Sequence, residues 1–545
     1  MSNEFDVIVI GAGINGAGIA RDAAMRGLKV LVLDKGDIGG GTSGWSTRLI
    51  HGGLRYLEHG EFALVKESLR ERACLMKIAP HLVRQLRLLV PVYKNARRGL
   101  WTIRAGMIAY DALSFRRTLP RHRMLSRAET LHQVPALGSE GLRGAAVYFD
   151  AQVEFAERLV VENALSAVAH GAAVLTYTRV EKLIFEAGDV RGVEFSRPSR
   201  TPTVREGSDR EHHSATARIV INAAGPWIDQ LLEASNTGSP RLIGGTKGSH
   251  IIVAPFAGAP DTAIYVEAET DGRPFFIIPW NGKYLIGTTD IRFTGDLDHV
   301  CVDSDEIDYL LRETNRVLPT AKLTREQILY AYSGVRPLPF TGDKDEQSIT
   351  RRHFIREHPE LPGLLSIVGG KLTTYRSLAE QTVDLVLKKL PAQPDRERSP
   401  RFSECTTALE PLPGADTDDF AALCASIKLR SRLPEPTNDR LLRIYGTRTS
   451  LIMKLVEADE SLAEVFDSET GAIAAEVVLA FKHELATTLA DCLLRRTMVG
   501  LNSTRGLTAV EAAGAIARKH LGWSDARVAQ ETAAYRNVIS PRLPG

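Results

Sequence analysis

The sequence predicts an α/β protein with three parts, and three observations support this class. The chain opens with a parallel β-α-β unit, because an apolar segment from Phe5, a glycine turn and an alanine-rich segment closing at Gly27 precede a second apolar segment at residues 29–33. Alternating apolar and polar segments predict an antiparallel sheet in a second lobe; they lie at residues 251–253, 275–278 and 284–289. Beyond residue 417 the pattern is helical.

The chain of 545 residues exceeds what one hydrophobic core supports, so we expect several domains. Residues 1–390 form a dinucleotide-binding domain interleaved with the second lobe. Residues 391–416, rich in proline and charge, form a linker, and residues 417–545 form a helical domain.

Local patterns predict the remaining elements. Residues 52–124 combine helical periodicity with basic clusters, and strands return at residues 173–227, interrupted by a polar loop at residues 196–218. Further helices are predicted at residues 372–390, 474–499 and 509–520.

Composition excludes several classes of protein. The net charge of +2 gives no general attraction to nucleic acid. The five cysteines form no C-x-x-C pair, so we expect reduced thiols in a cytoplasmic protein and no metal site. The N-terminus enters a glycine loop without a basic region, which excludes a signal peptide, and no segment is apolar and long enough to span a bilayer.

The glycine loop carries the first functional signal. Residues 11–16, Gly-Ala-Gly-Ile-Asn-Gly, match G-x-G-x-x-G between a predicted strand and a predicted helix. Gly11 permits the tight turn, Gly13 lets a pyrophosphate approach the backbone, and Gly16 lets helix and strand pack closely. Asp34 ends the second strand at the distance where a carboxylate binds a ribose hydroxyl.

The segment after Asp34 favours FAD over NAD. Both cofactors present an ADP half to the same unit, so the glycine loop does not distinguish them. A nicotinamide enzyme would continue into another crossover helix, whereas small and hydroxyl residues dominate residues 39–53 here. Such a run can pass close to an isoalloxazine ring and its ribityl chain, although an ordinary glycine-rich loop gives the same pattern.

Several blocks resemble the family of FAD-dependent, respiratory glycerol-3-phosphate dehydrogenases, and they occur in family order. They are LIHGGLRYL at residues 49–57, NAAGPW at 222–227, KGSH at 247–250, IGTTD at 286–290, YSGVRPL at 332–338, GGKLTTYR at 369–376 and LLRRT at 493–497. The resemblance covers nearly the whole chain.

The resemblance implies a doubly wound FAD-binding domain, an antiparallel-sheet substrate lobe and a C-terminal helical domain. It also implies oxidation of sn-glycerol 3-phosphate to dihydroxyacetone phosphate by hydride transfer to flavin N5, with a quinone as the next acceptor, and it allows a homodimer. The residues that we expect to bind FAD are Gly11, Gly13, Ile14, Asn15, Gly16, Asp34, Lys35, Thr42, Ser43, Ser46, Thr47, Arg48, His51, Gly52, Gly53, Val180, Ala223, Gly225, Trp227, Arg351, Gly370, Lys371, Leu372, Thr373 and Thr374.

A glycerol phosphate needs cations for its phosphate and a base for its alcohol proton. Arginine binds phosphate oxygens through two parallel hydrogen bonds. By resemblance Arg55, Tyr56, Arg336 and Lys371 face the substrate, and Arg336 also supports catalysis. His250 can accept a proton near neutral pH, although a buried structural histidine fits the pattern as well.

Residues 94–127 predict contact with a membrane surface. Arginine and lysine alternate there with aromatic and aliphatic residues, and such a segment can lie on anionic lipid, whereas a pair of solvated helices would show the same pattern. A quinone acceptor favours peripheral attachment to the inner face of the cell membrane. The alternatives that remain are an oxidase that uses oxygen and a flavin-binding sensor without catalysis.

Overall fold

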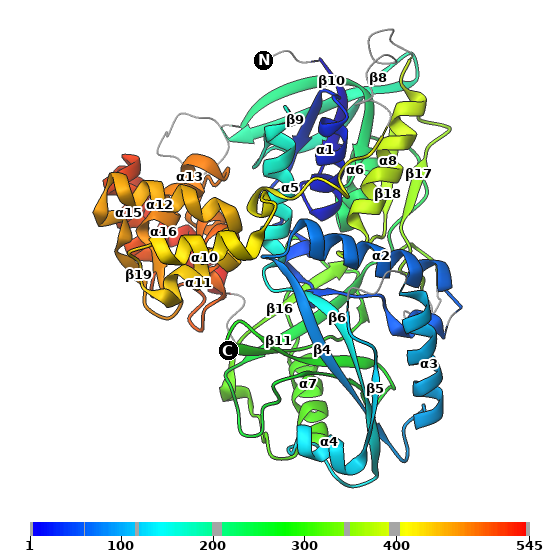
Figure 1. The fold of residues 1–545 in the computed structure, drawn as a ribbon. Helices are drawn as coiled ribbons and strands as arrows, with labels where there is room; N and C mark the ends of the chain where they lie inside the picture. The colour runs from blue at the N-terminus through cyan, green and yellow to red at the C-terminus, as the bar shows by residue number, and fades with distance from the viewer. Residues whose placement is uncertain are drawn as a thin grey trace.

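The computed structural model describes residues 4–58, 60–114, 119–198, 210–342, 349–391 and 404–540. Figure 1 shows three parts: a sheet with helices at the top, a second sheet below it, and a group of helices on the left that is coloured orange to red. The fold class predicted from the sequence is therefore confirmed. The C-terminal part contacts both of the others, since Glu484 pairs with Arg158 of the upper part and the Leu501 carbonyl accepts a hydrogen bond from Tyr330 of the lower sheet.

The upper sheet has eight strands, and five of them run parallel in the order β18, β10, β1, β2, β7. Their bounds are β1 Glu4–Ile10, β2 Val30–Leu33, β7 Ala173–Leu175, β10 Arg210–Asn222 and β18 Leu364–Val368. Three further strands pair antiparallel at its margins: β8 Arg179–Glu186, β9 Asp189–Pro198 and β17 Phe354–Glu357.

Both faces of the upper sheet are covered, as a doubly wound fold requires. Val7 and Val9 of β1 face one core, which contains α1 Ile14–Met25, α5 Ala156–Ala169 and α8 Tyr375–Lys389. Ile8 and Ile10 face the other core, under β8, β9 and the short helix α6 Ile228–Ala234. Because a strand covered on both faces is apolar throughout, the sequence of β1 lacks alternation.

The lower sheet has ten strands and is mostly antiparallel, in the order β15, β11, β14, β13, β12, β4, β6, β3, with β16 on β11 and β5 on β6. The bounds are β3 Leu49–Ile50, β4 Val83–Tyr93, β5 Arg123–Ser126, β6 Leu142–Val153, β11 Thr246–Val253, β12 Ala263–Glu267, β13 Pro274–Trp280, β14 Lys283–Gly287, β15 Ile291–Arg292 and β16 Ile328–Arg336. Helices α4 Arg127–Gln133 and α7 Ser304–Val317 lie at the bottom of this lobe in Figure 1.

Two predictions of secondary structure are wrong. Residues 52–124 are not all helical, because the long strand β4 lies between α2 Phe62–Ile78 and α3 Leu100–Leu113. The predicted polar loop at residues 196–218 is partly strand, since β9 runs to Pro198 and β10 begins at Arg210. Its middle, residues 199–209, lies outside the described residues.

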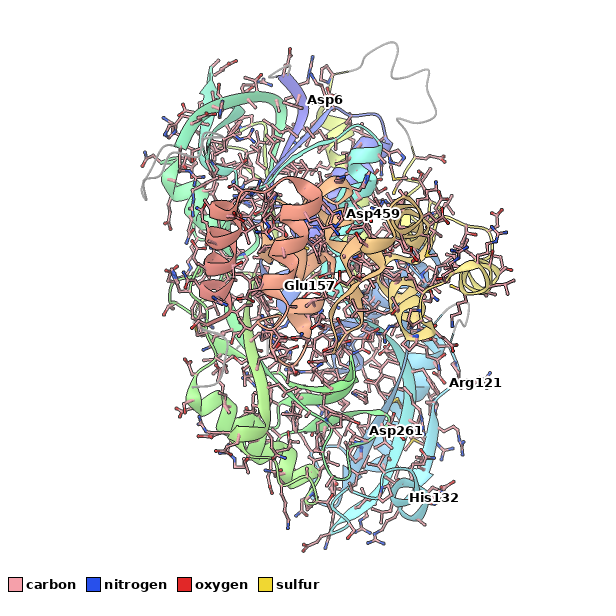
Figure 2. All side chains as sticks on the ribbon, turned by 90° about the vertical axis from the view of Figure 1, so that its left-hand side faces the viewer. Asp6, Arg121, His132, Glu157, Asp261 and Asp459 are labelled. Carbon is pink, nitrogen blue, oxygen red and sulfur yellow. The ribbon has the colours of Figure 1, made fainter. Side chains whose placement is uncertain are left out.

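The C-terminal part is helical, and Figure 2 views the molecule from its side. Its helices are α10 Phe420–Arg430, α11 Glu435–Tyr445, α12 Thr449–Ala458, α13 Ala474–His483, α14 Leu489–Asp491, α15 Val510–Leu521 and α16 Asp525–Ile539, with a small hairpin of β19 Val465–Asp467 and β20 Ala472–Ile473. Residues 474–499, predicted to be helical, form α13, α14 and the turn η10 Cys492–Arg496, with a break between α13 and α14 that the pattern does not indicate. The chain breaks after His483, where the buried Glu484 pairs with Arg158 of α5 and with Arg448.

A second buried ion pair joins the C-terminal part to the upper domain. Arg496 lies in the helical turn η10 Cys492–Arg496 and donates two hydrogen bonds of 2.8 Å to Asp37, which follows β2. Burial alone would raise the pKa of Asp37, but Arg496 and Arg495 hold that pKa below its usual range. The carboxylate therefore stays charged in this interface.

The described end of the predicted linker packs on the upper domain. Arg21 of α1 donates to the carbonyl oxygens of Thr407 and Glu410, and Leu412 is buried in the same core as α1. Residues 392–403 lie outside the described residues. The domain boundaries themselves stay a prediction.

Candidate active site

The glycine loop joins β1 to α1 as predicted. Gly11 has a φ of +102°, and a Cβ at this position would lie 2.7 Å from the carbonyl oxygen of Ala223, so the turn requires glycine. The amide of Ile14, in the first turn of α1, donates to the Ser43 hydroxyl at 3.0 Å. The run of small residues at 39–53 thus returns to the helix N-terminus, where backbone N–H groups favour an anion.

Asp34 lies at the carboxyl end of β2, beside this loop. Its carboxylate accepts hydrogen bonds from the amides of Ala12, at 2.6 Å, and Gly36, at 2.8 Å. Burial raises its pKa although both bonds oppose the shift. The residue stands where the sequence predicted a partner for a ribose hydroxyl.

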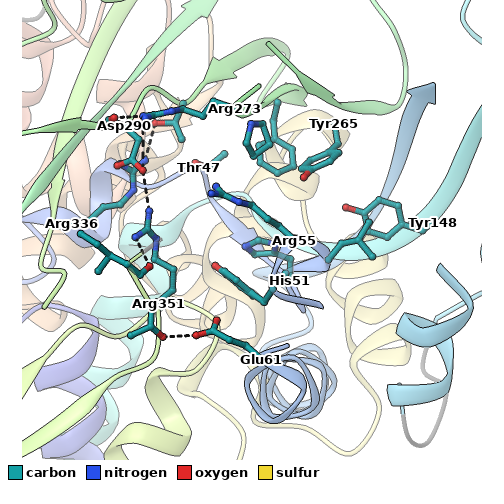
Figure 3. Close-up of a pocket in the computed structure, with 18 residues that line it drawn as sticks. Thr47, His51, Arg55, Glu61, Tyr148, Tyr265, Arg273, Asp290, Arg336 and Arg351 are labelled. Atoms are coloured by element: carbon teal, nitrogen blue, oxygen red, sulfur yellow. Dashed lines mark hydrogen bonds and ion pairs between the residues drawn. The ribbon is translucent and has the colours of Figure 1, made fainter. Parts of the chain in front are cut away.

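A cavity of about 480 Å³ lies between residues 47–61 and the strands of the lower sheet, with residues 349–351 also in its wall (Figure 3). Its lining includes four arginines: Arg55, Arg273, Arg336 and Arg351. Aromatic side chains of Tyr56, Tyr148, Tyr265 and Phe276 line it as well. The combination suits a small anionic ligand with an apolar carbon skeleton.

Asp290 organises three of the arginines. Arg336 and Arg351 each donate to one of its carboxylate oxygens at 2.9 Å, and Arg273 donates to its backbone carbonyl. Burial alone would raise the pKa of Asp290, but Arg336 and Arg351 lower it overall. One carboxylate therefore orients several guanidinium groups while leaving the site an excess of positive charge.

His250 lies directly behind the cavity, on β11, and is 1% exposed. Its Nε2 is 2.9 Å from the hydroxyl of Thr47, which lines the cavity, and its ring stacks on Tyr332 of β16. Burial, with Arg336 and Arg48 adding to it, lowers the pKa of His250 well below the usual range. The imidazole is therefore neutral near pH 7 and reaches the cavity through Thr47.

Lys371 also lies one layer back. Its Nζ is 4.1 Å from the centre of the Tyr56 ring and donates to Ser68 at 3.1 Å. Burial lowers its pKa to about 7, with Arg351 adding to the shift and Glu67 and Glu61 opposing it. Of the five predicted substrate residues, Arg55, Tyr56 and Arg336 line the cavity, and His250 and Lys371 support it from behind.

Comparison with known proteins identifies the family. The family model described as "FAD dependent oxidoreductase" matches residues 6–376, and the model "C-terminal domain of alpha-glycerophosphate oxidase" matches residues 405–528. A "Glycerol-3-phosphate dehydrogenase" of Synechocystis sp. is 46% identical over 550 residues, covering 98% of this chain and 96% of that protein. The chain belongs to the family of FAD-dependent glycerol-3-phosphate dehydrogenases.

Two further relatives agree with this assignment. The "Aerobic glycerol-3-phosphate dehydrogenase" of Bacillus subtilis is 32% identical over 501 residues, covering 90% of this chain and 87% of that protein. The crystal structure of a glycerol-3-phosphate dehydrogenase from Bacillus halodurans, complexed with FAD, superimposes with a TM-score of 0.75 at 27% identity. It covers 99% of this chain and 95% of its own.

The cofactor of this family is FAD, and the residues of this chain fit it. Asn15 Oδ1 and Thr374 Oγ1 are buried polar atoms without a hydrogen-bond partner. Asn15 lies beside the glycine pair Gly369-Gly370, because its Nδ2 donates to the Gly369 carbonyl at 3.4 Å, and Thr374 follows four residues after that pair. A Cβ at Gly370 would lie 2.8 Å from Asn15 Nδ2. Because buried polar atoms are rarely left unpaired, these two oxygens indicate that a polar group of a ligand binds between α1 and residues 369–374.

The other predicted FAD residues fall into two groups. Gly11, Ile14, Asp34, Ser43 and Ala223 surround the glycine loop, whereas Thr47, His51, Gly53 and Arg351 line the cavity. Burial lowers the pKa of His51 to about 4, so this imidazole is neutral. The side chain of Arg48 is occupied elsewhere, because it binds both carboxylate oxygens of Glu157 in a fully buried pair.

Sequence reasoning missed several residues of the site. Arg273 and Asp290 were not singled out, nor were Tyr148, Tyr265 and Glu61. Asp290 is the last residue of the block IGTTD at residues 286–290, and that block is its sequence signal. The others stand in stretches with no distinctive spacing.

Among the described residues, no helix is long and apolar enough to cross a bilayer. The same part of the chain contains no group of three or more histidine, cysteine, aspartate or glutamate side chains that could hold a metal ion.

Proposed function

We propose that the protein oxidises sn-glycerol 3-phosphate to dihydroxyacetone phosphate and passes the electrons through FAD to a quinone. The observation that carries this proposal is the cavity with four arginines, whose wall includes Thr47, His51 and Gly53 of the run that we expect to contact FAD. A phosphate dianion needs such a cluster, and the relatives with full-length similarity are named for this substrate.

The arginines bind and orient the substrate. Arg336 and Arg351 are fixed by Asp290, so their guanidinium planes are oriented before the substrate arrives, which reduces the entropy lost on binding. Tyr265 and Phe276, whose rings are 5.1 Å apart, form an apolar wall for the carbon chain.

His250 accepts the proton of the alcohol through Thr47. The neutral imidazole has a free lone pair, and the 2.9 Å contact lets the Thr47 hydroxyl pass its own proton to Nε2 while taking one from the substrate. This path requires the tautomer with hydrogen on Nδ1. When bound, FAD supplies the acceptor for the hydride that leaves the substrate carbon, at flavin N5.

The outer face of α3 supports contact with a membrane surface. Trp101 is 79% exposed and Ile108 53% exposed, and they lie on one side of the helix with Arg104 between them. Met107 and Tyr110 on the opposite side are buried against the lobe that holds the cavity. An exposed apolar face next to arginines suits the surface of anionic lipid, where quinone is available. Arg116 and Arg117 of the predicted basic segment lie outside the described residues.

One experiment tests the reaction and separates the two acceptors. Anaerobic mixing of the purified protein with glycerol 3-phosphate should bleach the flavin absorbance, and a flavin that stays oxidised would disprove the proposal. The bleached protein is then mixed with a short-chain quinone or with oxygenated buffer. Faster recovery with oxygen would favour an oxidase, which the match of residues 405–528 to the oxidase C-terminal model keeps as the second candidate.

A further inference from the structure

A loop of the substrate lobe reaches across to the FAD-binding domain. Residues 293–303 connect β15 to α7, and both ends of the loop are fixed on the substrate lobe. The amide of Phe293 donates to the Gly245 carbonyl at 3.0 Å, and the ammonium of Lys247 donates to the Cys301 carbonyl at 3.1 Å. The loop tip, at Asp298, extends from these two anchors.

Asp298 binds three groups of the FAD-binding domain. Its carboxylate accepts a hydrogen bond from Trp227 Nε1 at 2.9 Å, forms an ion pair with Lys35, and lies 3.8 Å from a guanidinium nitrogen of Arg179. The Lys35 ammonium also lies 4.3 Å from the centre of the Trp227 ring. These three partners come from three separate elements of the domain.

Two of the three partners, Lys35 and Trp227, are themselves predicted to bind FAD, and the third, Arg179, adjoins another predicted FAD residue. Lys35 follows Asp34, and Arg179 precedes Val180. The ring of Trp227 lies 3.3 Å from the place of a Cβ at Gly41, in the run that returns to the N-terminus of α1. Asp298 therefore ties together the elements around the predicted cofactor site from the opposite lobe.

The ion pairs of Asp298 with Lys35 and Arg179 are partly exposed to solvent. Asp298, Lys35 and Arg179 have exposed side-chain fractions of 39%, 29% and 46%. Partly exposed ion pairs contribute little individually and are screened by salt, so the loop can leave the domain without a large cost.

We propose that Asp298 is a latch by which the substrate lobe retains FAD. With the latch closed, the loop bridges Lys35, Arg179 and Trp227 and slows release of the cofactor. Opening of the latch frees these elements and lets FAD leave or enter. The proposal concerns retention of the cofactor and does not depend on the identity of the substrate.

The rate of FAD release tests the latch. The holoprotein is mixed with an excess of a flavin-binding apoprotein, and transfer of FAD is followed by flavin fluorescence. Asp298→Ala should release FAD about threefold to tenfold faster than wild type at low salt. Asp298→Asn, which keeps an oxygen for Trp227 and loses the charge, should be intermediate. The control is Asp305→Ala, which removes an exposed carboxylate from the first turn of α7.

Salt supplies a second measurement on unmodified protein. Raising the salt concentration should bring the wild-type release rate toward that of Asp298→Ala, whose own rate should change little. Equal release rates for Asp298→Ala and wild type at low salt would overturn the proposal, as would an equal acceleration in Asp305→Ala. If Asp298→Ala purifies without FAD, titration of the apoprotein with FAD should show the same loss as a weaker affinity, and an unchanged affinity would contradict the latch.

Discussion

At the scale of single residues, different side chains of the site carry positive charge and transfer protons. Arg336 is held by Asp290 and Thr288, so its position is set before any ligand binds. His250 makes no such ion pair; its hydrogen-bonding contact is with a hydroxyl that faces the cavity. Substitution of Arg336 should therefore weaken substrate binding as well as catalysis, whereas substitution of His250 should slow proton transfer.

Changing His250 tests the proton path. His250→Asn should slow anaerobic flavin reduction by about 100- to 10,000-fold with FAD content unchanged, because a positioned base contributes about that factor. Raising the pH should restore part of the rate. Stopped-flow absorbance measures both effects, and reduction at the wild-type rate would return His250 to a structural role.

Thr47 provides the matched pair of variants for the same path. Thr47→Val keeps the shape and removes the hydroxyl, so it should lower the rate of flavin reduction substantially, whereas Thr47→Ser should retain most of it. FAD content, measured by absorbance, controls for loss of cofactor. Equal rates in the two variants would mean that the proton leaves by another route.

The lowered pKa of Lys371 predicts that kcat/KM depends on pH. Its pKa is lowered to about 7, so the ammonium is charged below that pH and becomes neutral as the pH rises through it. Since the charged form favours a phosphate, kcat/KM should fall between pH 7 and 9, by about threefold to tenfold. Lys371→Arg stays charged over this range and should flatten the profile. A profile that is identical in wild type and Lys371→Arg would exclude this role.

The sequence could predict several residues of the site, but it could not predict which side chains lie next to one another in space. His250 and Arg336 were found because their blocks resemble a known family. Arg273 and Asp290 join them only through the strand register, in which His250 pairs with both Gly287 and Tyr332. The placement of Thr47 between His250 and the cavity depends on how η1 Thr42–Trp45 packs on β16, where Thr42 donates to the Val335 carbonyl. No local pattern contains that information.

At the scale of elements, α3 packs against the segment that lines the cavity, because the Tyr110 hydroxyl accepts a hydrogen bond from the amide of Gly52 at 2.9 Å. Leu54 of the cavity wall packs in the same cluster as Met107 and Tyr110. Arg98, just before α3, pairs with Glu58 and with Glu267 at the end of β12. The helix is thus both the candidate membrane face and a support of the site.

Replacement of the outer face of α3 tests membrane contact. Trp101→Ser with Ile108→Ser should shift the protein from the membrane fraction to the supernatant in sedimentation with anionic vesicles, because apolar area and charge together determine such binding. Added salt should release wild type in part. A control, Leu429→Ser, removes an 88% exposed leucine from α10 in the C-terminal part. Unchanged partition of the α3 variant would remove this face from consideration.

The elements that sequence reasoning missed were decided by tertiary contacts. The strand β4 contains Pro91 and an unbroken apolar run, which obscure its alternation. The break after α13 places Glu484 against Arg158, and Leu485 adopts a φ of +59° there. Helical periodicity was right on both sides of that break and gave no sign of it.

At the scale of the whole molecule, buried ion pairs hold the C-terminal helices on the FAD-binding domain. Asp37→Asn leaves Arg496 without the carboxylate that it binds here and leaves Arg495 with Asp491 alone, and breaking a buried pair costs about 3–5 kcal/mol. The variant should unfold at a temperature several degrees lower, measured by calorimetry. Asp416→Asn, an exposed position, is the control. A variant Asp37→Asn as stable as this control would show that the interface does not depend on the pair.

The same pair predicts acid sensitivity. The pKa of Asp37 is depressed in the folded protein, so its contribution is present above the unfolded value of about 3.9 and is lost as the pH falls through the folded value. The difference in stability between wild type and Asp37→Asn should therefore shrink in acid.

The strand order also has a consequence for how the chain is made. β1 pairs with β10, which lies about 200 residues further along, and β10 pairs with β18 near residue 364. At about 5–20 residues per second, a ribosome needs tens of seconds to deliver these partners after β1 has emerged. Until β10 has been made, β1 can pair only with β2, and the far edge of β10 stays open until β18 follows. Each open edge exposes unpaired backbone groups to which another chain can pair, so the partly made chain is most prone to aggregation during this interval.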